Sequence, residues 1–400
     1  MRARTAMQLM LAGAPRVRRA MQHVFVAQAL SLGVLLIVIL AMLLLLMLVS
    51  TGAGTLGAQS PLASRAWSID PTPTLRIGHQ AAAGREFSIV VGATRLPDGG
   101  VLVGDRGDFN LLRFDASGSL VKRSARAGKG PGEIQFAIYM LRCGDSVVTI
   151  DSDKRVSIFT LAGEYVRTFR FTSPRDAYRS GCSSAGKFIH YGWERDSETK
   201  KGRFRALVPV WISPSDNGAP TMLPSTLGSE RNEGMPLPMG REPRVALGRD
   251  RAYVASADSM FVRVFALTGA ELPPLRAPYA PTRPTPADVA AAIERDVAFM
   301  GEKARNAIES GYRTAPQVEL LPATRELVVD ADDNLWVQHY PRGTVPTVAW
   351  TVFSKAGRVL STVQIPRNLE VFEIGRDYVL GRYTDPEEGV PEVRAYKLKR

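Results

Sequence analysis

The sequence predicts an all-β fold built from a four-stranded unit that repeats around a ring. A Phe-x-x-x-Gly element occurs four times, each time after an alternating strand that follows a turn, and each time before a further strand. The units recur about every 45 residues, which is the length that a four-stranded propeller blade needs. Two weaker units, at 180–212 and 369–398, bring the count to six. We therefore predict a six-bladed β-propeller. The four copies lie at 114–118, 159–163, 265–269 and 353–357.

The ends of the repeat predict how the ring closes. The last unit, 369–398, holds only three strands before the chain ends at Arg400. The segment PTLRIG (73–78) stands before the first unit at the distance at which each fourth strand precedes its successor, so we expect it to complete the last unit. Such pairing removes the two open sheet edges of a linear stack. A β-sandwich followed by a helical piece is the alternative, but it explains neither the period nor the incomplete last unit.

The first unit resembles a known blade pattern. The stretch VLVGDRGDFNLLRFDASG (101–118) is similar to the blades of exported bacterial six-bladed propellers of the NHL-repeat-like and TolB-like groups, and GKGPGE (128–133) is similar to one of their turns. Where that family commonly has Asn and Arg in the blade turn, this chain has Asp108 and Asn110. The resemblance covers 66–400. It implies a fold rather than an activity, because propellers of this type serve as binding scaffolds, lyases and hydrolases alike.

The N-terminus is typical of an export signal. Five arginines and no acidic residue occupy the first 24 positions, and an uncharged apolar run follows over 32–49. Eighteen such residues are also just enough to span a bilayer as a helix. We expect residues 1–58 to be a cleaved signal peptide or a retained inner-membrane anchor with a short linker, and both interpretations stay open. Either one places the propeller on the periplasmic or extracellular side.

The charge argues against one class of partner. The chain carries a formal net charge of +12, of which the five N-terminal arginines account for five, so +7 remains on the exported part. No block of Lys and Arg interleaved with aromatic residues occurs, which disfavours a nucleic-acid partner.

The two cysteines predict a disulfide. Cys143 and Cys182 each end the predicted innermost strand of a unit, and the two units are neighbours. Innermost strands converge near the ring axis, and an even cysteine count in an oxidising compartment favours pairing. Two buried free thiols are the alternative.

Equivalent positions at the ends of the second strands predict a ligand site. Asp105, Asp151, His339 and Arg382 take this position in four units. Ring closure brings them around one axis, on the face that carries the connections between units. The two aspartates have an alternative role as acceptors of backbone hydrogen bonds in turns. Arg382 suits a two-pronged contact with a carboxylate or phosphate, and Trp193 is expected to add an apolar wall.

One helix is predicted over 285–311, within the connection between the fourth and fifth units. Thr285 and Asp288 form a capping box, and Gly311 is a candidate end. A lid over the site and a cap on exposed blade edges both stay open for this helix. Its apolar stripe comprises Val289, Ile293, Val297, Met300, Ala304 and Ile308.

Two functions remain. Beyond the signal, the histidines are isolated at 79, 190 and 339, so no zinc site is predicted, and the DADDN stretch (330–334) is expected to be a β-turn rather than a calcium loop. We predict a non-catalytic binding module, without a cofactor, for a small molecule, glycan or protein. The alternative is a calcium-dependent hydrolase or lyase with its site at the channel mouth, where the Asp ring supplies part of the oxygen ligands.

Overall fold

A computed structural model describes most of the chain beyond the N-terminal segment. All described residues belong to one compact unit, Ser64–Arg400. The predicted signal or anchor (1–58) and Trp193 lie outside the described residues. Within the described part, no helix is long and apolar enough to cross a membrane. The described ranges are 66–78, 87–107, 109–135, 137–151, 155–170, 177–192, 201–215, 218–343, 345–385 and 389–400.

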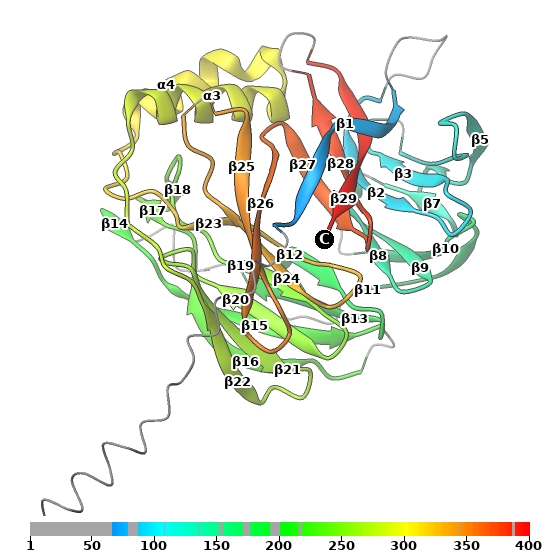
Figure 1. Cartoon of the computed structure of the whole chain (residues 1–400), viewed down its shortest axis with the longest axis horizontal. Helices are drawn as coiled ribbons and strands as arrows, with labels where there is room; N and C mark the ends of the chain where they lie inside the picture. Colours follow the sequence, from blue (N-terminus) through cyan, green and yellow to red (C-terminus); the bar gives the residue numbers. More distant parts are fainter. Residues whose placement is uncertain are drawn as a thin grey trace, which may run out of the picture. The chain divides into compact units, whose positions relative to one another are not determined.

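The fold is all-β and propeller-like, and its described part contains six antiparallel four-stranded sheets (Figure 1). We number them in chain order. Sheet 1 comprises β2 (Val90–Arg95), β3 (Val101–Asp105), β4 (Asn110–Phe114) and β5 (Leu120–Arg123). Sheet 2 comprises β8 (Ala137–Cys143), β9 (Ser146–Asp151), β10 (Arg155–Thr160) and β11 (Tyr165–Arg170). Sheet 3 comprises β12 (Ala177–Cys182), β13 (Lys187–Gly192), β15 (Leu207–Pro214) and β16 (Thr221–Leu227).

The second half of the chain repeats this order. Sheet 4 comprises β19 (Arg244–Leu247), β20 (Arg251–Ala255), β21 (Phe261–Ala266) and β22 (Glu271–Arg276). Sheet 5 comprises β23 (Thr324–Val329), β24 (Leu335–His339), β25 (Thr347–Phe353) and β26 (Val359–Pro366). Sheet 6 comprises β27 (Leu369–Ile374), β28 (Tyr378–Thr384), β29 (Pro391–Lys399) and β1 (Ser68–Ile77).

Two small sheets of short strands lie outside the six four-stranded sheets in the described part of the chain. β6 (Arg126–Ala127) pairs in parallel with β7 (Glu133–Ile134) in the segment between sheets 1 and 2. A further three-stranded sheet consists of β14 (Arg203–Phe204), β17 (Arg231–Asn232) and β18 (Met235–Pro236). The sequence did not predict this small sheet, because its strands are two residues long and carry no alternating pattern.

The first strands of the sheets contact one another in a closed circuit. β2 contacts β8, β8 contacts β12, and the series continues through β19, β23 and β27 back to β2. The sheets therefore surround a common axis, with their first strands innermost. Two of these neighbouring first strands, β8 and β12, are also joined covalently. Cys143 at the end of β8 and Cys182 at the end of β12 form the predicted disulfide, with Cα atoms 5.3 Å apart.

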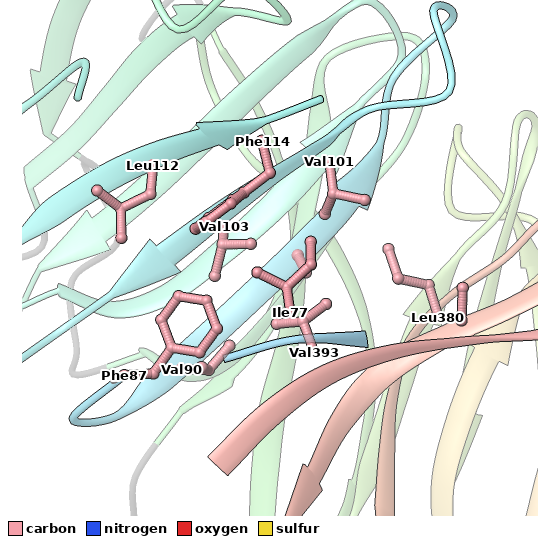
Figure 2. Close-up of a cluster of buried hydrophobic side chains, with 11 residues drawn as sticks. Ile77, Phe87, Val90, Val101, Val103, Leu112, Phe114, Leu380 and Val393 are labelled. Atoms are coloured by element: carbon pink, nitrogen blue, oxygen red, sulfur yellow. The ribbon is translucent and has the colours of Figure 1, made fainter. Parts of the chain in front are cut away.

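The N-terminal strand completes the last sheet, as the sequence predicts. β1 pairs with β29 in antiparallel fashion, and Ile77 lies opposite Val393. Figure 2 shows Ile77 between residues of sheet 1, such as Val103 and Phe114, and residues of sheet 6, such as Leu380. The strand begins at Ser68, five residues before the predicted start. Burial of this apolar cluster stabilises the pairing of β1 with β29, which closes the ring of sheets.

The repeated Phe-x-x-x-Gly element has a simple structural role. In sheet 2, Phe159 is fully buried near the end of β10, and the Gly163 N–H donates to the Thr160 carbonyl at 2.9 Å to close the turn into β11. Gly163 has φ of 78°, a backbone conformation that favours glycine. The pattern therefore combines a core anchor with a turn residue, which explains its recurrence.

The predicted single helix is two helices. α3 (Pro286–Met300) begins with the expected capping box of Thr285 and Asp288, but it ends at Gly301, whose φ is 93°. A one-turn 3-10 helix (Glu302–Ala304) leads into α4 (Arg305–Thr314). The predicted stripe is also only partly right, since Met300 is 63% exposed. The buried residues of α3 are Asp288, Ala291, Ala292 and Val297.

Candidate functional site

The predicted site residues lie at one end of the sheets. Asp105 is opposite Val90, Asp151 is opposite Ala137, and His339 is opposite Thr324, so each faces the first residue of an innermost strand. Arg382 is opposite Glu370, the second residue of β27. The connections from one sheet to the next enter the innermost strands at this end. We call it the connecting face.

Asp105 holds the backbone of this face. The residue is 3% exposed, and its carboxylate accepts hydrogen bonds from the N–H groups of Ser88 (3.1 Å), Ile89 (3.0 Å) and Gly107 (3.0 Å). These bonds tie the turn after β3 to the entry of β2. They correspond to the turn role that the sequence left open for the aspartates.

Asp151 acts through a neighbouring arginine. It accepts a hydrogen bond from the Arg155 N–H at 2.8 Å, and its other oxygen lies 3.4 Å from the Arg155 Nε. Arg155 in turn donates to the carbonyls of Lys129, at 2.7 Å, and Glu133. Asp151 thus orients the arginine that holds the GKGPGE segment onto sheet 2. A ligand-binding role for Asp105 and Asp151 stays a prediction.

His339 lies at the end of β24 and is partly buried. Its Nε2 is 2.8 Å from the Thr351 Oγ1. Burial lowers the pKa of the imidazole, so the ring is neutral near pH 7. A neutral imidazole bonded on one nitrogen offers its other nitrogen as a single donor or acceptor.

Arg382 joins sheet 6 to sheet 1 at the connecting face. Its guanidinium donates to the Val90 carbonyl at 2.8 Å and to the Glu370 carboxylate. Since Val90 also lies opposite Asp105, the structure brings Arg382 and Asp105 to the same end of β2. The Arg382 Cζ is 5.9 Å from the ring centroid of Phe299, which belongs to α3 and is 56% exposed.

α3 is fixed to the connecting face at its other end. The buried Asp288 carboxylate accepts two bonds from Arg342, at 2.9 and 3.0 Å, and one from the Gly343 N–H at 2.7 Å. Phe299 stands eleven positions after Asp288 on the helix, which corresponds to a rise of about 16 Å. α3 therefore reaches from the loop after β24 in sheet 5 to Arg382 in sheet 6. Figure 1 shows both helices at this end of the sheets.

Sequence reasoning missed a cluster of basic and aromatic side chains at α3. Arg295 of α3 lies with its Cζ 6.0 Å from the Tyr340 ring centroid. Arg367, which precedes β27, donates to the Arg342 carbonyl at 3.2 Å and to the Gly343 carbonyl. Burial, and then repulsion from Arg295, lower the pKa of the Arg367 guanidinium. We call Arg295, Tyr340 and Arg367 the arginine cluster.

A second charged network belongs to the scaffold. Glu230 is 3% exposed and accepts bonds from Arg203, at 2.6 Å, and Arg241, at 3.0 Å. Arg241 also reaches Asp258, which Arg205 contacts at 2.7 Å. Each carboxylate is thus shared between two guanidinium groups, and the network ties the small sheet of β14, β17 and β18 to sheet 4.

Two features bear on ligand size and metals. A small pocket under α3 and α4, with Met239, Tyr312 and Val318 in its wall, has a cavity of about 20 Å³, enough for about one water molecule. Within the described residues, no group of three or more His, Cys, Asp or Glu side chains is arranged to hold a metal ion.

Comparisons with known proteins support the fold. No protein-family model matches the chain, and no curated protein matches it. A solved structure of a member of the DUF4221 family from Bacteroides vulgatus is similar over 84% of this chain and 99% of its own, with a TM-score of 0.51 at 9% identity. At that identity the likeness shows the fold alone.

Two other solved structures are less similar. A Bacteroides fragilis protein whose name describes it as exported has a TM-score of 0.46 at 13% identity, over 84% of this chain and 96% of its own. Regucalcin from Agrobacterium tumefaciens, a calcium-binding protein, has a TM-score of 0.40 at 10% identity, over 83% and 95%.

Proposed function

We propose that this protein is an exported, non-catalytic six-bladed β-propeller of the NHL-like type that binds a small molecule, glycan or protein on its connecting face. The site is centred on Arg382 and His339, and Asp105 and Asp151 hold the loops around it. The blade count is supported by the six four-stranded sheets and the closed circuit of their first strands.

The proposed periplasmic or extracellular location is supported by two observations. The arginine-rich start followed by the apolar run 32–49 is typical of an export signal. The bond between Cys143 and Cys182 is of a kind that persists in oxidising compartments.

The contact between Arg382 and Phe299 carries the proposal for the site. Arg382 has a side chain that is 14% exposed, and its guanidinium lies beside an aromatic ring that remains open to solvent. Met300, next to Phe299, is also exposed. A cation with a bidentate fork beside exposed apolar side chains fits ligands that combine an anionic or polar group with an apolar body.

Thermal-shift screening of the protein against glycan and lactone panels, with and without calcium, tests this function. We expect at least one compound to raise the melting temperature, Tm, without added calcium. The variant R382K keeps the charge but loses the two-pronged geometry, so the ligand-induced shift should disappear while the ligand-free Tm stays within about 3 °C. H339Q, which retains a partner for Thr351, should weaken the shift.

A matched control exists on another sheet. Arg263 also pairs with a carboxylate, Glu271, and lies over an aromatic ring, Phe265. R263K should leave the ligand-induced shift unchanged. Equal loss in R263K and R382K would remove the assignment to Arg382, and turnover of a lactone that requires calcium would instead establish the enzyme alternative.

A further inference from the structure

We propose that the arginine cluster, Arg295, Tyr340 and Arg367, is an anion subsite that takes a phosphate or carboxylate group of a small molecule. The proposal rests on the proposed function of the connecting face, since α3 connects this cluster to Arg382. The expected ligand is an oxyanion. Phosphate and carboxylate both present a pair of oxygens that can accept two parallel hydrogen bonds from a guanidinium group.

The charge balance around the cluster favours an anion. Three arginines lie along α3. Arg342 pairs with Asp288, and its carbonyl accepts from Arg367. Arg295 lies over the Tyr340 ring. Two carboxylates lie beside these arginines. Asp288 forms an ion pair with Arg342. The Asp296 carboxylate is 3.2 Å from the Arg295 Nε and also accepts a hydrogen bond from the Tyr312 hydroxyl. One positive charge therefore remains, and Arg367 bonds only to carbonyls in the contacts described above.

Tyr340 provides an independent observation. The residue is 7% exposed, and its buried hydroxyl has no hydrogen-bond partner among the described residues. The Arg295 guanidinium lies over the Tyr340 ring, with its Cζ 6.0 Å from the ring centroid. A buried hydroxyl left without a partner is destabilising. An oxyanion bound between the two arginines would accept a hydrogen bond from it.

The position of the cluster fits a ligand that also reaches Arg382. Arg295 and Phe299 are four residues apart on α3 and therefore lie on the same side of the helix. Phe299 contacts Arg382. A ligand with its anionic group at Arg295 and Arg367 would place its apolar body along Phe299, toward the centre of the proposed site.

Titration of the full-length protein with inorganic phosphate, and separately with benzoate, tests the subsite. Sodium chloride at matched ionic strength is the reference. We expect phosphate, benzoate or both to raise the Tm beyond the chloride reference. R367Q should weaken binding of the effective anion at least about tenfold. If R367Q does not fold, R367K, which keeps the charge but loses the fork, provides the same comparison.

Two further variants separate binding from stability. Y340F removes only a hydroxyl that has no partner, so its ligand-free Tm should be unchanged or higher, while its anion affinity should fall several-fold. R313Q removes one exposed positive charge from α4 and should bind like the wild type. Equal weakening in R313Q and R367Q would indicate general charge attraction and would overturn the subsite.

The outcomes distinguish this inference from the proposed function. If R382K abolishes anion binding and R367Q does not, the anion binds at Arg382, and the function stands without this subsite. If neither anion raises the Tm beyond the chloride reference, the subsite is wrong whatever the ligand panel shows. If the glycan and lactone panels yield no ligand but R367Q and Y340F weaken phosphate binding, the anion subsite is supported and the proposed ligand-binding function of the connecting face is not.

Discussion

Asp288 and Arg342 form a two-pronged ion pair, with bonds of 2.9 and 3.0 Å, that anchors the first turn of α3 to the loop after β24. Asp288 also caps its own helix by accepting from the Thr285 N–H at 2.8 Å. One buried carboxylate thus fixes both the start of α3 and its place on the connecting face. Hydrogen bonds outweigh the effect of burial and hold the pKa of this carboxyl well below its ordinary value.

The first prediction concerns this anchor. D288N should lower the free energy of unfolding by about 2–4 kcal/mol, because it leaves Arg342 without its partner and weakens the cap. E294Q is the control on the same helix, since Glu294 forms a two-pronged pair with Arg305 in an exposed position. That variant should lose less than about 1 kcal/mol. Urea denaturation measures both, and equal losses would contradict the anchor role.

The second prediction concerns the disulfide. Cys143 and Cys182 are 39 residues apart in sequence, and a loop of that length corresponds to about 4 kcal/mol in the loop-entropy treatment. The double variant C143A/C182A should lose about that much stability. Wild-type protein in a reducing agent should fall to the same value, while the double variant should not respond to the agent. If the reducing agent leaves the free energy of unfolding of the wild type unchanged, the disulfide does not stabilise the fold.

The third prediction concerns pH. Burial would raise the pKa of the Glu392 carboxyl, but hydrogen bonds from Arg76 and Arg394 outweigh it and bring it to about 2. This folded-state pKa lies below the ordinary value of 4.5. The stability that ionised Glu392 contributes is therefore fully present above pH 4.5 and is lost as the pH falls from 4.5 toward 2. The contribution is on the order of 1–3 kcal/mol, because solvent screens part of the interaction.

The variant E392Q should remove this part of the acid sensitivity. Its free energy of unfolding, measured between pH 7 and pH 2.5, should fall less steeply than that of the wild type. E271Q is the control, because the pair of Glu271 with Arg263 is exposed to solvent. If E392Q and wild type show the same slope, the Glu392 network does not contribute to acid stability.

The fourth prediction concerns ring closure. Arg400 bonds to Asp330 at 2.9 Å and to the Gly375 carbonyl at 3.0 Å, and its Cζ is 4.7 Å from the Trp67 ring centroid. R400A should therefore lower stability by about 2–4 kcal/mol, since it uncovers the buried Asp330 carboxylate at the junction of sheets 5 and 6. R376A, which removes a largely exposed partner of Asp332, should cost less than about 1 kcal/mol. Losses of equal size in thermal unfolding would contradict the closure role.

The repeat, the closing strand, the disulfide and the start of α3 were predicted correctly because each depends on local chemistry or on counting. Turn residues, capping residues and strand alternation carry their geometry in the sequence itself. The DADDN turn is an example, since Asp330 accepts from the N–H groups of Asp332 and Asn334 at 2.9 Å each. The end of α3 was predicted wrongly, because the apolar stripe continues past Gly301 while the backbone there takes φ of 93°.

The site was harder to predict from the sequence. The repeat position placed Asp105, Asp151, His339 and Arg382 on one face, but an Asp in that position serves a turn as readily as a ligand. The arginine cluster had no sequence signal, because Arg295 reaches Tyr340 only when α3 lies against the loop after β24. Such a contact depends on the path of a long connection, which a repeat pattern does not record.

The most direct test of the account is a crystal structure of the protein with the compound that stabilises it best. We predict that the bound compound lies on the connecting face, within hydrogen-bonding distance of Arg382 and beside Phe299. A compound bound instead on the opposite face, where the disulfide lies, or on the outer strands would contradict the account.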